Sequence, residues 1–202
     1  MKTITTIIAL TTLTAAAVAG PLTFDFKDPK GVNNATFKLD APLEAISGSA
    51  SGITGTVTFD PANPAATTGT IRVASQSLTV PNPMMQGHLL GDKWLDTAKF
   101  SEISFAVKAM ANVKTEGNTT SADASGTFTL KGVAKEMTIP VKLTYLPGKL
   151  AQRVPNLRGD LLVVRASFQI TRSDFALMPG QMEEKVANTI DVTLSVAGAA
   201  PK

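Results

Sequence analysis

The sequence predicts an all-β protein, an antiparallel barrel or sandwich of about eight strands with one short helical insert. Three observations support this fold class. Apolar and polar residues alternate over most of the chain, turns rich in Gly and Pro separate the alternating stretches, and a single stretch has helical spacing. With 202 residues, 44% of them hydrophobic and 17% charged, the chain suits one domain without visible repeats or linkers.

The first part of the chain carries predicted strands at residues 22–26, 35–39, 53–59 and 70–74. A turn signal, Asp-Pro-Lys-Gly at residues 28–31, separates the first two. Residues 60–64 are expected to form a loop, because Pro61 and Pro64 would break a hydrogen-bond ladder.

Residues 82–100 interrupt this pattern with helical spacing. Asn82 and Pro83 are typical of the N-cap and first position of a helix. Apolar pairs four residues apart, which share a helix face, are Met85/Leu89 and Leu90/Trp94. Gly87 and Gly91 each cost about 1 kcal/mol relative to Ala in a helix interior. We therefore expect two short helical turns rather than one long helix.

The second part of the chain carries predicted strands at residues 102–108, 124–130, 134–145, 161–170 and 189–197. Residues 112–125 are small and polar, which predicts a mobile hairpin loop or a frayed strand pair, and residues 146–160 are expected to form a loop. The clearest alternation places Met137, Ile139, Val141, Leu143 and Tyr145 on one face. Pro140 cannot donate to a ladder, so this strand should carry a bulge or lie at an edge near that point.

The N-terminus has the features of a cleaved signal peptide. Lys2 supplies a positive charge, an apolar and threonine-rich stretch follows, and Ala17-Val18-Ala19 fits the small-x-small cleavage rule. We expect residues 1–19 to be removed, leaving residues 20–202 as one barrel domain in the periplasm or outside the cell. A transmembrane anchor is disfavoured, because it needs about 18 or more consecutive apolar residues.

Composition excludes several partners and folds. The net charge is only +3 and no basic run is interleaved with aromatic residues, so we expect no nucleic-acid partner. One Trp and one Tyr cannot build the two aromatic girdles of a membrane-embedded barrel. We therefore expect no transmembrane segment after cleavage of the signal. Cysteine is absent, so disulfides cannot form.

His88 is the only candidate imidazole base or metal ligand. A catalytic triad would need a serine and a carboxylate beside it, and no GxSxG elbow occurs. A metal site would have to combine His88 with Asp92 and Asp96, without a second His or any Cys. We therefore expect no catalytic residue and no metal, and we interpret His88 as a polar anchor.

The alternating faces leave the interior undecided. A barrel of about eight strands is either packed solid or hollow enough for one ligand, and alternation does not separate the two cases.

Several segments, in this order along the chain, resemble the YceI-like family of bacterial exported proteins. They are residues 88–96 (HLLGDKWLD), 99–105 (KFSEISF), 126–133 (GTFTLKGV) leading to 139–141 (IPV), 172–175 (RSDF) and the closing strand at 186–196. The chain departs from the family at Gln86-Gly87, where many members carry Arg-Asp, and at Ala176, which replaces a common glycine. Its opening strands lack the histidines that are often seen there.

This resemblance implies an extended lipocalin-like barrel around a long apolar tunnel. It also implies binding of polyisoprenoids, isoprenoid quinones or similar amphiphiles, without catalytic residues. Members of the family often pair, so a homodimer is a further expectation.

The leading hypothesis is an extracytoplasmic carrier or reservoir for an isoprenoid lipid or quinone-like amphiphile, which is bound inside the barrel and needs no other cofactor. The expected ligand contacts are Met85, His88, Leu89, Trp94, Phe100, Ile103, Phe105, Phe128, Leu130, Ile139, Val141, Leu143, Phe168 and Ile170. One alternative is a stress-related structural protein with a filled core. Another is a lipid-modifying enzyme that uses His88 with Asp92 or Asp96.

Overall fold

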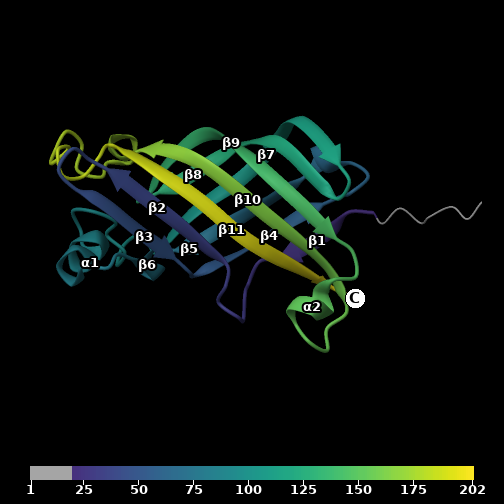
Figure 1. Ribbon diagram of the computed structural model, residues 1–202. Helices are drawn as coiled ribbons and strands as arrows, with labels where there is room; N and C mark the ends of the chain where they lie inside the picture. The colour runs from purple at the N-terminus through teal and green to yellow at the C-terminus, as the bar shows by residue number, and fades with distance from the viewer. Residues whose placement is uncertain (1–19) are drawn as a thin grey trace, which may run out of the picture.

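Strands dominate the computed structural model, which describes residues 20–202 (Figure 1). The expected signal peptide, residues 1–19, lies outside the described residues. The strands are β1 (Leu22–Asp25), β2 (Asn34–Asp40), β3 (Ala45–Ala50), β4 (Ile53–Phe59), β5 (Thr68–Ala74), β6 (Leu78–Thr79), β7 (Glu102–Glu116), β8 (Thr119–Leu130), β9 (Val133–Leu146), β10 (Gly159–Thr171) and β11 (Thr189–Pro201). The helices are α1 (Pro83–Leu90) and α2 (Leu150–Arg153), with 3-10 turns at Pro64–Ala66, Ser75–Ser77 and Arg172–Phe175.

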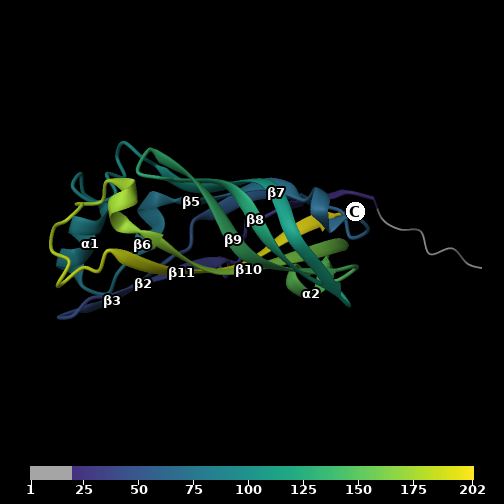
Figure 2. The same cartoon turned by 90° about the horizontal axis from the view of Figure 1, so that it is seen from above.

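The sheet closes into an antiparallel barrel, which confirms the predicted fold class. Its strands follow the order β1-β4-β5-β7-β8-β9-β10-β11, and β1 pairs with β11 through Asp25 and Ala199. The order continues past β11 as β2-β3-β6. β3 is followed by β4 after two residues, and β5 is followed by β6 after one 3-10 turn. β2, β3 and β6 therefore extend the wall of the barrel beyond the ring of eight strands. The barrel is therefore elongated, with α1 at one end and α2 and the C-terminus at the other (Figures 1 and 2).

The hairpin of β7 and β8 decides between the two alternatives predicted for residues 112–125: the segment is a strand pair, paired up to Glu116 and Thr119, and not a mobile loop. Both strands continue to a tight turn at Gly117 and Asn118, where Gly117 has a φ of 60°. Burial alternates strictly along β8, and its inward side chains before Phe128 are small: Thr120, Ala122, Ala124 and Gly126. Because these side chains are small and flanked by polar ones, the sequence lacks the strong apolar contrast that identifies a strand.

Three further elements were missed, namely β3, the two-residue β6 and α2, and one edge was predicted correctly. β3 has the sequence AISGSA, whose Gly and Ser residues hide its alternation, and α2 lies inside the predicted loop at residues 146–160. The β9–β10 ladder ends at the pair Val141 and Ala166, next to Pro140. The expected edge near this proline is therefore confirmed, since β9 is paired only with β8 beyond it.

Hydrogen bonds and ion pairs close the α2 end of the barrel. The buried Asp160 carboxylate accepts from the Tyr145 hydroxyl at 2.8 Å, the Gly148 N–H at 2.8 Å and Lys202 Nζ at 2.9 Å. Arg153 in α2 pairs with Asp28 at 2.9 Å and donates to the buried Asn33 at 3.0 Å. Aromatic residues fill the interior of the barrel behind these hydrogen bonds and ion pairs. Phe24 and Phe26 are among them and have no exposed surface.

The contacts of the Asp160 carboxylate with Tyr145, Gly148 and Lys202 lead us to expect a loss of stability in acid. Burial alone would raise the pKa of Asp160, but the hydrogen bonds from Gly148, Lys202 and Tyr145 outweigh it and lower the pKa below 3.8. A lowered folded-state pKa stabilises the fold above about pH 4, and this contribution is lost as the pH falls through the folded-state pKa. Asp160→Asn should therefore cost about 1–3 kcal/mol at pH 7 in urea unfolding. The cost should shrink at pH 3, and an equal cost at both pH values would contradict the assignment.

An apolar cavity open at one end as the candidate functional site

An apolar cavity of about 860 Å³ runs inside the barrel. This volume falls in the range of roughly 300–1,000 Å³ that is usual for small-molecule sites. Its walls combine residues of both core clusters, such as Leu39 and Ile190 near α1 and Val57 and Leu143 toward α2. The cavity favours the hollow alternative over a filled core.

All of the expected contact residues except Phe100 line this cavity. They are Met85, His88, Leu89 and Trp94 at the α1 end, with Ile103, Phe105, Phe128, Leu130, Ile139, Val141, Leu143, Phe168 and Ile170 on the strands. Phe100 lies outside the cavity. Its ring occupies the space beside Gly132 that a Cβ would fill, and Lys99 Nζ lies 5.2 Å from the ring centroid.

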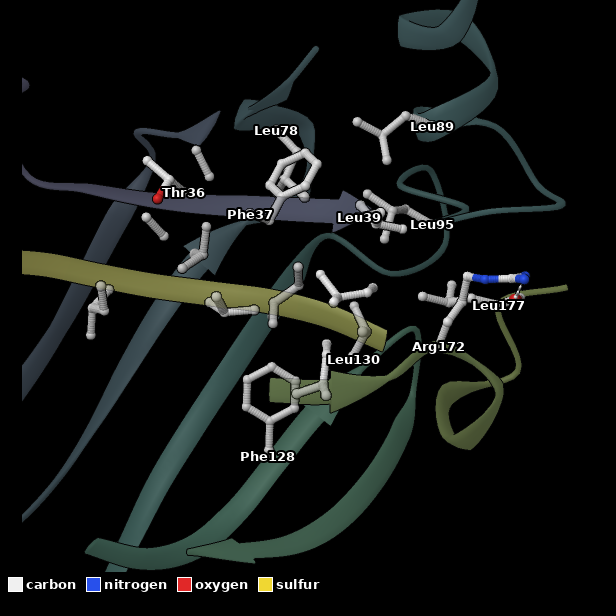
Figure 3. A pocket seen from close by; sticks show the side chains of 18 of the residues that line it. Thr36, Phe37, Leu39, Leu78, Leu89, Leu95, Phe128, Leu130, Arg172 and Leu177 are labelled. Atoms are coloured by element: carbon white, nitrogen blue, oxygen red, sulfur yellow. Dashed lines mark hydrogen bonds between the residues drawn. The ribbon is translucent and has the colours of Figure 1, made fainter. Parts of the chain in front are cut away.

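Other lining residues were not expected from the sequence. They include Phe37 and Leu39 on β2, Ile46 on β3, Val73 on β5, Leu78 on β6, and Leu177 and Val186 beyond β10 (Figure 3 shows Phe37, Leu39, Leu78 and Leu177). Phe37 and Leu39 lie on the predicted strand at residues 35–39. The alternation of apolar and polar residues in this strand could therefore have identified them as inward-facing. Leu177 lies between the predicted strands at residues 161–170 and 189–197, where no alternation indicates an inward side chain. Val186 begins the segment that resembles the closing strand of the family, but it lies before β11.

Helix α1 forms one side of the cavity mouth. Asn82 caps it, because its side-chain oxygen accepts from the N–H groups of Met84 at 2.9 Å and Met85 at 3.2 Å. The Gln86 side chain fastens the helix to the wall by accepting from Val80 N–H at 2.8 Å and donating to Leu78 O at 2.9 Å. The helix passes through Gly87 and ends at Leu90, so the expected second helical turn is wrong: residues 92–95 form turns.

A lid segment, defined here as residues 176–188, forms the other side of the mouth and is held by Arg172. This arginine has no exposed surface, and its guanidinium donates only to backbone carbonyls. These carbonyls belong to Leu177, Met178 (2.6 Å), Gln181 (2.8 Å), Val186 (3.2 Å) and Ala187 (3.4 Å). Figure 3 shows Arg172 beside Leu177 at the edge of the cavity.

The surroundings of Arg172 leave it no donor for a ligand. The Trp94 ring centroid lies 5.4 Å from its guanidinium carbon, so the cation also contacts an aromatic face. Burial lowers the pKa of Arg172, and the negative charge of Glu183 opposes this shift. All five of its N–H groups are used on the lid. Arg172 therefore shapes the mouth rather than binding what enters it.

Methionines and polar side chains form the rim of the mouth. Met84, which is 73% exposed, and Met182, which is 52% exposed, both line the opening, together with Met85 and Met178. Their thioether side chains are flexible, so the shape of this opening can adapt. The polar groups at this end of the cavity include Asn82, His88, Asp92, Lys93 and Lys185.

His88 lies exposed on α1 at this rim. Asp92 shares the rim with it, whereas Asp96 does not line the cavity. Within residues 20–202, no group of three or more His, Cys, Asp or Glu side chains is placed to hold a metal ion. None of the helices in that part of the chain is long and apolar enough to cross a membrane.

Comparison with known proteins identifies the family. A family model for the YceI-like domain matches residues 29–197. The UPF0312 protein of Enterobacter sp. (strain 638) is 30% identical over 152 residues, which cover 73% of this chain and 70% of that protein.

Solved structures share the fold. BcnA from Burkholderia cenocepacia superposes with a TM-score of 0.64 at 20% identity, covering 82% of this chain and 94% of that chain. A polyisoprenoid binding domain from Saccharophagus degradans gives a TM-score of 0.63 at 14% identity, covering 89% and 99%. The family match over residues 29–197 and the shared barrel lead to one conclusion: this chain belongs to the YceI-like family.

Proposed function

We propose that this protein binds an isoprenoid lipid or a quinone-like amphiphile inside its barrel and serves as a carrier or reservoir outside the cytoplasm. The observation that carries this proposal is the apolar cavity of about 860 Å³, open at the α1 end. Membership of the YceI-like family and the polyisoprenoid binding of the Saccharophagus domain support the ligand class. The signal-like sequence of residues 1–19 supports the location.

The two ends of the barrel give the ligand an orientation. The α2 end is closed by the hydrogen bonds around Asp160 and by the buried rings of Phe24 and Phe26. Polar side chains gather at the α1 end. An apolar tail therefore enters from the α1 end, and its head group stays at the rim near His88 and Lys93. The lining away from the rim is mostly apolar, with a few hydroxyls such as those of Thr36, Thr67 and Ser104, so we expect selection to act on the tail more than on the head.

The dimensions and energies suit a tail of several isoprene units. On β10 the cavity lining runs from Val164 to Ile170, which gives roughly 23 Å of strand and about 18 Å of depth at a tilt of about 40°. Burying one five-carbon unit contributes up to about 4 kcal/mol, at about 0.8 kcal/mol per carbon. Two or three units could therefore provide the roughly 8 kcal/mol of micromolar binding, after ordering costs, without a charged contact.

Organic extraction of the purified protein, followed by mass spectrometry, tests this proposal. We expect an isoprenoid-type molecule to be released in about one equivalent per chain, because the cavity has the size of a single-ligand site. The extracted protein should then take up a short polyprenol or ubiquinone, measured by fluorescence of Trp94 at the mouth. A protein that is repeatedly empty and takes up neither probe would overturn the proposal. Fractionation of the source cells tests the location separately.

A further inference from the structure

A second concavity, here called the outer groove, lies away from the mouth. It has a volume of about 480 Å³ and crosses strands β7 to β11. Its polar lining consists of Asn112, Lys114, Ser121, Asp123, Lys142, Arg165, Ser167 and Thr193. Val141, Ala166 and Leu194 line both the groove and the apolar cavity, so a single layer of sheet separates the two.

Strand register brings three cations into one row across this groove. Lys114 on β7 pairs with Ser121 on β8, which pairs with Lys142 on β9, which pairs with Arg165 on β10. Lys142 and Arg165 are thus directly opposite on neighbouring strands. Among the registered pairs of residues 20–202, this is the one pair that joins two like charges. Like charges directly opposite in a sheet destabilise it.

The fold does not compensate this repulsion with a carboxylate. Other strand cations have carboxylate partners, as in Lys38–Asp40 at 2.7 Å and Lys108–Glu136 at 2.8 Å. Lys135 on β9, outside the groove, has no carboxylate within 4.0 Å among residues 20–202, but it does not face a second cation across the sheet. No carboxylate of the described chain lies within 4.0 Å of a cationic nitrogen of Lys114, Lys142 or Arg165. Asp123, which shares the groove, instead accepts from Asn112 Nδ2 at 2.7 Å.

We propose that the outer groove binds a phosphate group, which supplies the negative charge that the fold omits. A guanidinium presents a planar fork that matches phosphate oxygens, and two lysines add point charges beside it. The hydroxyls of Ser121, Ser167 and Thr193 offer further donors. This site is separate from the apolar cavity, so it does not depend on the ligand proposed there. The phosphate belongs either to a soluble ion or to the head group of a membrane lipid.

Thermal unfolding at low ionic strength tests the groove with inorganic phosphate as the probe. We expect the Tm of the full mature chain to rise with phosphate and to rise less with chloride at matched ionic strength, because a ligand that binds only the folded state stabilises it. Lys142→Gln should raise the Tm without phosphate, since it removes the repulsion with Arg165, and should weaken phosphate binding by about tenfold or more.

Two variants separate the groove from a general charge effect. Lys108→Gln removes the same charge from β7 but breaks the pair with Glu136, so its Tm should not rise and its phosphate response should match the wild type. Lys142→Arg keeps the charge and should keep the phosphate response. An absent response in the wild type, or an unchanged response in Lys142→Gln, would overturn the proposal.

Vesicle flotation decides the source of the phosphate. If the source is a membrane, the wild type should float with vesicles that contain phosphatidylglycerol but not with pure phosphatidylcholine, and Arg165→Gln should stop flotation. If the source is soluble, the Tm response persists without flotation. Flotation that Arg165→Gln and Lys142→Gln leave unchanged would contradict a role of the groove in it.

Discussion

Replacing Phe105 by aspartate is expected to abolish retention of an apolar ligand. Phe105 lies on β7 opposite Ile71 and Phe128, and its ring lines the cavity. A carboxylate there either stays ionised in apolar surroundings or draws water into the cavity, and both disfavour a hydrocarbon tail. A loss of about 3 kcal/mol corresponds to roughly a hundredfold weaker binding. Titration of the extracted protein with ubiquinone or a short polyprenol measures this loss.

Ala109→Asp is the matched control for this substitution. Ala109 lies on the same strand and is exposed, so the new charge remains in water. It should leave both binding and Tm close to the wild type, while Phe105→Asp should keep the strand signature in circular dichroism. Equal binding by the two aspartate variants would mean that the ligand does not occupy this part of the barrel.

Replacing Arg172 by methionine is expected to cause the largest loss of stability. The substitution keeps an apolar stem of similar reach but removes the donors to five carbonyls. Each buried acceptor that loses its donor costs about 1–3 kcal/mol, and water can reach some of them after the change. We expect a total of about 3–5 kcal/mol in urea unfolding, in the range typical of broken buried networks. Hydrogen exchange should accelerate first in the lid segment.

Arg158→Met provides the comparison, because Arg158 is exposed in the loop before β10. Its substitution should change the free energy of unfolding by no more than about 0.5 kcal/mol. Arg172→Lys should fall between the two, since an ammonium keeps the charge but has fewer donors. A lid whose exchange is unchanged in Arg172→Met would contradict the role assigned to this residue.

The face of a strand was predictable wherever large apolar side chains alternate with polar ones. Along β9 the predicted inward residues Ile139, Val141 and Leu143 line the cavity, because period-2 alternation determines the face once a strand exists. The first half of β8 and the whole of β3 were missed, because most of their inward positions hold small residues: Thr120, Ala122 and Ala124 on β8, and Gly48 and Ala50 beside Ile46 on β3. These allow close approach, as at Gly126, where a Cβ would meet the Ala106 carbonyl, but they give no hydropathy contrast.

The mouth was only partly predictable, for a different physical reason. Helix capping by Asn82 is a local interaction, so the start of α1 could be placed from neighbouring residues. The lid depends on backbone carbonyls, which every residue possesses, so no side-chain pattern identifies them as partners of Arg172. Phe100 has the apolar character of a lining residue, yet the missing side chain of Gly132 gives its ring a place outside the cavity.

The pairing of Asp25 with Ala199 has a consequence for how the protein folds. These residues lie near opposite ends of the described chain, so the barrel cannot be sealed until β11 has been delivered to β1 and β2. Before that step the sheet has open edges and exposes the apolar faces that later surround the cavity. Contacts so distant in sequence make folding slow. The topology that encloses the apolar cavity therefore delays closure of the barrel until the last strand is paired. The chain is most prone to aggregation in the interval before that step.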